Sequence, residues 1–252
     1  MVILMNDSKR NIKIILGYDG TNYSGFQRQK NGITIQEKIE SAGFQLTATN
    51  ITITGAGRTD SGVHAKGQVV NFFTQTKLVP EKIQKALNAI LPEDIVVQKV
   101  EEVPLDFHSR YSAKSKTYSY RIYNGESRPL FERNFVYFYK RQLNLTNMEL
   151  AAKQICGTHD FKTFQATGSS VKTTIRKVNF CTLDQIGSEI RLEINADGFL
   201  YHMVRNIVGT LIMVGNGKIT FEDFKKILDS QDRNLAGPTA PAQGLCLEKV
   251  YY

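Results

Sequence analysis

The chain has 252 residues, of which 41% are hydrophobic and 22% are charged, and its formal net charge is +8. A chain of this length can bury a hydrophobic core without disulfides or metals, and the basic balance favours polyanionic partners, nucleic acid before acidic membrane surfaces. Three separated cysteines without a CxxC pair argue against a disulfide framework or a zinc site, and favour reduced thiols in the cytoplasm.

The first part of the chain alternates between strand and helix patterns. Apolar or alternating runs predict strands over residues 11–18, 51–54, 69–73 and 95–103. Thr34 and Glu37 have the spacing of a capping box, and the following helix has an apolar stripe of Ile35, Ile39, Ala42 and Leu46. Pro80 opens a second helix, with Ile83, Leu87, Ile90 and Leu91 on one face and Pro92 as its stop.

The second part repeats this mixture of patterns. Strands are predicted over residues 116–123, 173–183, 188–195 and 245–250. Helices are predicted from a cap at Thr146 to near Gly157, over 202–214 and over 220–229. Together the elements predict an α+β fold, with a boundary that divides the chain into residues 1–105 and 106–252.

Two segments resemble each other across this boundary. Residues 12–20 read IKIILGYDG and are followed by TNY, and residues 190–198 read IRLEINADG and are followed by FLY. The repeat predicts two related half-domains, although a strand followed by Asp-Gly is also a common chance phrase.

A membrane segment is not expected. The apolar run at the start, MVILM, is too short for a signal peptide or a membrane span, and no later run reaches the ~18 apolar residues that a spanning helix needs. The longest candidate, residues 203–214, is interrupted by Arg205 and Asn206.

The segment GAGRTDSGVHA, residues 55–65, has the strongest chemical character. Three glycines within eight residues allow sharp bends and a close approach to a ligand, and Arg58 stands two residues before Asp60. A phosphate-binding P-loop would need GxxxxGK and a dinucleotide fingerprint would need GxGxxG, and neither spacing is present. From the residues alone, a structural turn with Asp60 as a cap remains open.

This segment resembles the catalytic motif of the tRNA pseudouridine synthase A family, usually GRTDAGVHA. Further blocks in the same order resemble that family's motifs, with Phe26 where the family often has Trp: YDGTNYSGFQRQ at 18–29, FHSR at 107–110, KTYSY at 116–120, GTHDF at 157–161, ADGFLYHMVRN at 196–206 and GPTAP at 237–241. Each block is moderately specific, and the full ordered set is very specific.

The resemblance implies a function and a fold. The family converts uridine to pseudouridine at positions 38, 39 and 40 of the tRNA anticodon arm, without cofactor or metal and usually as a homodimer. The implied pseudouridine synthase fold has two related α+β half-domains, with antiparallel or mixed sheets, around a basic cleft. An RNA-binding protein without activity, or an enzyme that holds nucleotide phosphates in the glycine loop, are the alternatives.

The resemblance also implies roles for single residues. Asp60 is expected to be the essential carboxylate, Arg205 its ion-pair partner and Tyr118 a wall of the uridine pocket. Arg58 is expected to contact phosphate or hold the nucleotide out of the stack. Further substrate contacts are expected from His202, Arg110, Lys116, Gln27 and Arg28.

Two of these roles have a simpler alternative. Arg205 lies off the apolar stripe Met203, Ile207, Leu211 and Val214, so it could be an ordinary polar-face arginine, and a strand tyrosine such as Tyr118 is often core packing. The four histidines, His64, His108, His159 and His202, lack metal-ligand spacing. We expect His64 to satisfy a hydrogen bond within the loop.

Overall fold

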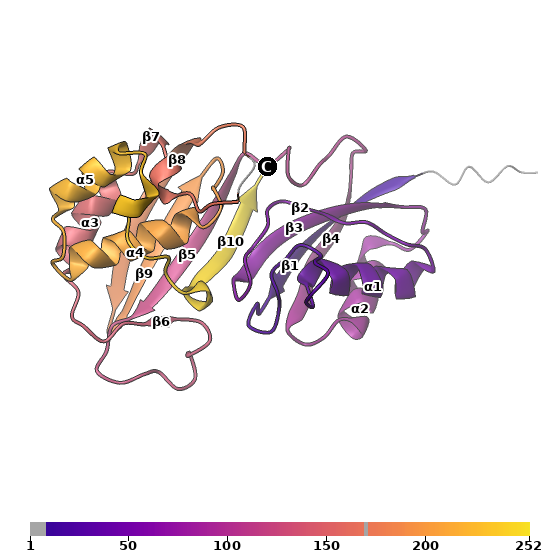
Figure 1. The fold of residues 1–252 in the computed structure, drawn as a ribbon. Coiled ribbons are helices and arrows are strands. Elements are labelled where there is room, and N and C mark those ends of the chain that lie inside the picture. Colours follow the sequence, from indigo (N-terminus) through magenta and orange to yellow (C-terminus); the bar gives the residue numbers. More distant parts are fainter. Residues whose placement is uncertain (1–8, 169–170) are drawn as a thin grey trace, which may run out of the picture. The chain divides into compact units, whose positions relative to one another are not determined.

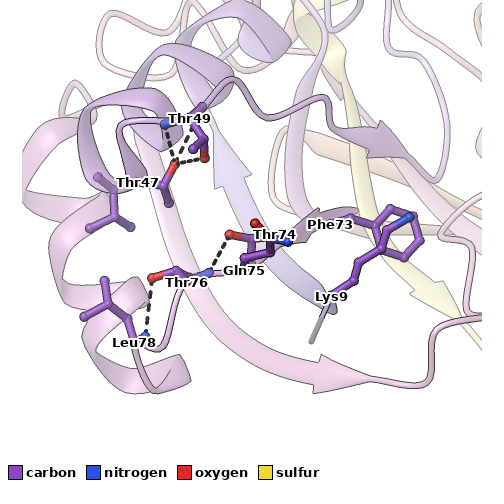
Figure 2. Close-up of a pocket in the computed structure, with 9 residues that line it drawn as sticks. Lys9, Thr47, Thr49, Phe73, Thr74, Gln75, Thr76 and Leu78 are labelled. Atoms are coloured by element: carbon purple, nitrogen blue, oxygen red, sulfur yellow. Dashed lines mark hydrogen bonds between the residues drawn. The ribbon is translucent and has the colours of Figure 1, made fainter. Parts of the chain in front are cut away.

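The structure is a computed structural model that describes residues 9–168 and 171–252 (Figure 1). It divides into two compact units, the first ending at Ala113 and also including Tyr252, and the second running from Lys114 to Tyr251. The division lies a few residues after the boundary that the sequence suggested. The apolar run MVILM lies outside the described residues.

The sheet of the first unit is antiparallel. Its long strands are β1 (Arg10–Tyr18), β3 (His64–Thr74) and β4 (Ile95–Val103), and β1 lies between β4 and β3. The two-residue strand β2 (Thr54–Gly55) pairs with β3 and leads into the glycine-rich loop.

Two helices pack together against this sheet. The first, α1 (Ile35–Thr47), begins where the Thr34 hydroxyl accepts the Glu37 N–H, and it ends at Ala48 in the left-handed conformation. The second, α2 (Pro80–Ile90), begins with proline and packs on β4 (Figure 1). Both predicted N-termini are confirmed, and most of each apolar stripe is buried, although Leu46 and Ile90 stay partly exposed.

The second unit is built on a larger sheet. Its strands are β5 (Ser115–Tyr123), β6 (Tyr137–Phe138), β7 (Gly157–Asp160), β8 (Ile175–Ile186), β9 (Glu189–Ala196) and β10 (Leu245–Tyr251). The order β10-β5-β9-β8-β7 is antiparallel throughout, and β6 adds a short parallel pair to β5.

Three helices of the second unit pack together: α3 (Leu145–Lys153), α4 (Met203–Gly215) and α5 (Phe221–Asp229) (Figure 1). A capping box between Thr220 and Asp223 starts α5. The middle helix, α4, is buried on nearly all sides rather than along the single stripe expected. It packs against α5, which carries the fully buried Phe224, and its Asn206 side chain donates to the main-chain oxygen of Phe164, another fully buried residue.

The α+β class predicted from the sequence is confirmed, and several element boundaries were wrong. The expected strand at 51–54 is reduced to β2, because only its last residue finds a partner on β3. The strand expected at 69–73 begins five residues earlier, at His64. The cap of α3 is Asn144 rather than Thr146.

The two resembling segments occupy similar places in their sheets. Residues 12–18 lie in β1 and residues 190–196 lie in β9, and each strand has a neighbour on both sides. Both strands run directly into an Asp-Gly pair. A common origin of the two halves stays a prediction.

The Phe224 ring gives a test of the second unit's core. The ring is fully buried, and its centroid lies 5.9 Å from that of Phe164. We expect Phe224→Ala to lower the free energy of unfolding by about 3–5 kcal/mol, since it leaves a cavity among aromatic rings. Urea unfolding measures this, and a loss below about 1 kcal/mol would contradict the packing described.

Candidate active site

The glycine-rich loop between β2 and β3 has no regular secondary structure. Several of its main-chain groups nevertheless form hydrogen bonds. Ala56 donates its N–H to Val69 O (2.8 Å), Phe26 donates to Thr59 O (3.0 Å) and Val63 donates to Asp60 O (3.1 Å). These bonds connect the loop to β3 and to the YDGTNYSGFQRQ segment. The loop is therefore positioned by two separate parts of the first unit.

A buried hydrogen-bond network fixes the residues on either side of Arg58. The Gln68 side-chain amide donates to Gly57 O at 2.9 Å and lies 3.4 Å from the Tyr18 hydroxyl. That hydroxyl lies 2.7 Å from Thr59 Oγ1. Tyr18, Thr59 and Gln68 are all buried, and a satisfied polar network of this kind specifies one local geometry. Sequence patterns did not identify Gln68.

Two glycines let the YDGTNYSGFQRQ segment touch the loop backbone. A Cβ on Gly20 would lie 2.1 Å from Val63 O, and one on Gly25 would lie 2.8 Å from Thr59 O. Gly25 also has a φ of +90°, which side chains rarely adopt. The two motifs are thus packed backbone to backbone.

Asp60 and Arg58 extend from this supported loop. Asp60 is partly exposed and Arg58 is exposed. The neighbouring Ser61 hydroxyl donates to Tyr23 O at 3.1 Å, and Tyr23 in turn donates its hydroxyl to Asp94 (2.6 Å). Burial, followed by the bond to Asp94, raises the Tyr23 pKa far above its usual value, so this hydroxyl stays a donor.

His64 makes a hydrogen bond, but to a partner outside its own loop. Its Nδ1 accepts the Gly20 N–H at 3.0 Å, and the ring is buried. The histidine therefore joins the start of β3 to the same glycine that touches Val63.

The other expected contact residues of the first unit lie at its surface. Gln27, Arg28 and Arg110 are exposed. Arg28 forms an ion pair of 2.7 Å with Glu40 of α1, which the sequence did not indicate. Arg110 places its guanidinium carbon 5.7 Å from the Tyr111 ring centroid.

Tyr118, on β5 in the second unit, is 7% exposed. Its ring meets Phe199 edge to face, with centroids 5.0 Å apart. Lys116 lies two residues earlier on the same strand and is partly buried. Arg121, another basic residue of this strand, pairs with Glu189 at 2.7 Å.

Arg205 is bound to the GPTAP segment at the start of α4. Its Nε donates to Ala240 O at 2.7 Å, and the Ala240 N–H donates to Arg205 O at 3.1 Å. Its charge also acts on Tyr120: burial raises the pKa of this tyrosine and Arg205 partly opposes that rise. His202, just before α4, has a φ of 60° and stacks near Tyr201, with ring centroids 3.9 Å apart.

A second buried network supports the start of α4. The Asn206 side chain donates to Phe164 O (2.8 Å), and its oxygen accepts from Thr239 Oγ1 (2.6 Å) and Arg233 Nη2 (3.0 Å). Arg233 also donates to Gly237 O at 3.0 Å, and burial lowers its pKa. The sequence gave no role to Arg233, and only its distance of a few residues from GPTAP could have suggested one.

The expected site residues divide between the two units. The first contains Asp60, Arg58, Arg110, Gln27 and Arg28, and the second contains Tyr118, Lys116, His202 and Arg205. An ion pair between Asp60 and Arg205 stays a prediction.

The described residues contain no metal-binding cluster, no disulfide and no helix that could span a membrane. In the described ranges, no three His, Cys, Asp or Glu side chains gather as a metal-binding group. None of the three cysteines forms a disulfide, and burial raises the Cys181 pKa. None of the helices in residues 9–168 and 171–252 combines the length and apolar character that crossing a bilayer requires.

Comparisons with known proteins give the family. A profile described as tRNA pseudouridine synthase matches residues 14–112 and 151–252. The chain is 50% identical to a tRNA pseudouridine synthase A of Clostridium acetobutylicum, 49% to a tRNA pseudouridine synthase A 2 of Clostridium perfringens and 47% to a tRNA pseudouridine synthase A of Acetivibrio thermocellus. Each match covers 96% of this chain and all of the relative.

The chain belongs to the tRNA pseudouridine synthase family. It is therefore an isomerase that converts uridine to pseudouridine in tRNA. The family resemblance expected from the motifs is confirmed.

The contact at Gly25 gives a test of the loop. Gly25→Ala places a methyl group against Thr59 O in a left-handed conformation, so the loop backbone must move. We expect a loss of about 1–3 kcal/mol in unfolding free energy and a larger fractional loss of pseudouridine formation. Gly168→Ala is the matched control, because this glycine also has a positive φ (+88°) but no atom lies within 4 Å of its added Cβ. Equal effects of the two substitutions on pseudouridine formation would contradict the proposed support.

Proposed function

We propose that the chain isomerises uridine at positions 38, 39 and 40 of the tRNA anticodon arm, with Asp60 as the essential carboxylate. The observation that carries this proposal is the loop of Asp60. A partly exposed carboxylate stands on an irregular loop that buried hydrogen bonds and two glycine contacts hold in place. A loop needed only as a turn would not require this support.

The reaction suits a carboxylate. The C1′–N1 bond of uridine breaks, the base turns, and C1′ joins C5. The C5 proton passes to solvent and N1 takes up a proton, so that the product is an isomer of the substrate. No electrons are gained or lost overall, so we propose that no redox cofactor or metal takes part. Asp60 can act as nucleophile, as stabiliser of the detached sugar, or as base, as carboxylates do in glycoside hydrolysis.

The target uridine must leave its stack to expose C1′ and C5. We assign Arg58 to the phosphate beside this nucleotide, or to holding the nucleotide out of the stack, because its guanidinium is exposed two residues from Asp60. Tyr118 is assigned to the wall of the uridine pocket. The Tyr118 ring is held by its edge-to-face contact with Phe199, so it offers a rigid rather than a mobile surface.

Arg205 is assigned as the ion-pair partner of Asp60. The bond from its Nε to Ala240 O fixes the plane of the guanidinium, and a fixed arginine fork can hold a carboxylate with two parallel hydrogen bonds. An adjacent arginine favours the ionised form of an aspartate. His202, Arg110, Lys116, Gln27 and Arg28 are assigned to further contacts with tRNA.

The assembly and location are also proposals. The resemblance supports a homodimer. The three cysteines without disulfides, together with a tRNA substrate, support a cytoplasmic location. Tritium release from tRNA that contains 5-³H-uridine distinguishes this function from the two alternatives. These are an RNA-binding protein without activity and a nucleotide-binding enzyme. We expect tritium release from wild-type tRNA, and no release from a tRNA without uridine at positions 38–40.

We expect Asp60→Asn to abolish pseudouridine formation and to preserve tRNA binding. The amide keeps the shape of the side chain but cannot act as nucleophile or base. Tritium release and filter binding measure the two properties, and Asp184→Asn, at an exposed position on β8, is the control for a lost carboxylate. Wild-type turnover in Asp60→Asn would remove the assigned role.

We expect Arg205→Lys to lower the single-turnover rate at saturating enzyme more than it lowers tRNA affinity. Lysine keeps the charge but lacks the planar fork and the Nε–H that binds Ala240 O. A 100-fold loss corresponds to about 2.7 kcal/mol of lost transition-state stabilisation. A rate within threefold of wild type would make Arg205 an ordinary helix arginine.

A further inference from the structure

A short turn at residues 107–112 presents an aromatic ring that the assigned catalytic roles do not use. Tyr111 is 77% exposed, more than any other tyrosine among the exposed large hydrophobic side chains of the described residues. Arg110 beside it is also exposed. A side chain this exposed contributes little to the core, so its packing inside the unit does not explain it.

The turn is anchored from beneath. Ser109 is fully buried, its N–H donates to Asn71 Oδ1 (2.9 Å), and its hydroxyl lies 2.5 Å from Asn71 Oδ1 and 2.6 Å from Thr54 O. The Asn11 side-chain amide donates a hydrogen bond to Phe107 O at 2.8 Å. Because Thr54 belongs to β2, the turn is bound to the strand that leads into the loop of Asp60.

The ring itself is also held in position. His108 Nδ1 accepts the N–H groups of Arg110 (3.2 Å) and Tyr111 (3.3 Å), which orients the imidazole. That imidazole supports the Tyr111 ring, with centroids 4.3 Å apart and planes 34° apart. An exposed aromatic that is already ordered loses little conformational entropy when a ligand binds.

We propose that Tyr111 is a stacking platform for an unpaired nucleobase of the bound tRNA, and that Arg110 contacts an adjacent phosphate. Proteins that bind single-stranded RNA combine such rings with basic side chains. The Arg110 guanidinium carbon lies 5.7 Å from the Tyr111 centroid, so one nucleotide can reach both side chains. The stacked base is distinct from the target uridine.

This inference rests on tRNA as the substrate and is independent of the roles assigned to Asp60 and Arg205. The test compares Tyr111→Ala with Tyr111→Phe by filter binding of a tRNA transcript at several salt concentrations. We expect Tyr111→Ala to weaken binding about 5- to 150-fold, the range of one stacked base, and Tyr111→Phe to stay within twofold of wild type. The single-turnover rate at saturating enzyme should fall less than the affinity.

Salt dependence separates the two side chains. Stacking releases no counterion, so Tyr111→Ala should keep the slope of log K against log[salt]. Arg110→Gln should reduce that slope by about 0.7–0.9, the value for one phosphate contact. Phe44→Ala, on the exposed side of α1 and 48% exposed in the wild type, is the matched aromatic control and should bind tRNA normally.

Several outcomes would overturn the inference. Tyr111→Ala that binds within twofold of wild type would remove the platform, and Tyr111→Phe as weak as Tyr111→Ala would mean that the hydroxyl acts rather than the ring. A change in sedimentation of Tyr111→Ala would make the ring a protein interface. Failure of wild-type protein to bind tRNA would instead count against the proposed function.

Discussion

The close approach of two backbones is the constraint on which the candidate site depends. Gly20 and Gly25 bring the YDGTNYSGFQRQ segment against residues 59–63, where any side chain would collide with a carbonyl oxygen. Residues 56–63 lie between β2 and β3 and belong to neither strand, so the regular pairing of these strands does not hold them in place. Direct contact and the buried Tyr18–Gln68 network take over that function, and they fix Arg58 and Asp60 relative to the sheet.

The sequence correctly predicted the starts of α1, α2 and α5. Pro80 and the capping residues Thr34 and Thr220 start helices where expected, because their effect depends on a few neighbouring residues. The strand expected at 51–54 failed because alternation cannot reveal whether a partner strand is present. The uniform burial of α4 was also missed, since it depends on what surrounds the helix. The role expected of Asp60 rests on the resemblance, because the neighbouring glycines equally suit a plain turn.

Long-range polar networks are the part that the sequence does not reveal. Asn11, Asn71 and Ser109 are separated by up to 98 positions, yet they form one buried cluster in the first unit. In the second unit, Asn206, Arg233 and Thr239 form another. Each cluster includes motif residues to which no catalytic role is assigned, Ser109 in the first unit and Asn206 and Thr239 in the second. The motifs therefore indicate the family and the residues proposed for its reaction, while the structure shows which hydrogen bonds hold those motifs in place.

The position of Tyr252 has a consequence for the order of folding. This residue follows β10 of the second unit, but it packs in the first, where its hydroxyl donates to Ser109 O (2.8 Å) and its ring contacts Phe107. A ribosome makes the first unit more than a hundred residues before it makes this tyrosine. The turn that carries Tyr111 therefore gains its contacts with Tyr252 only after the second unit has been synthesised, whereas its hydrogen bonds to Asn11, Asn71 and Thr54 can form as soon as the first unit is made.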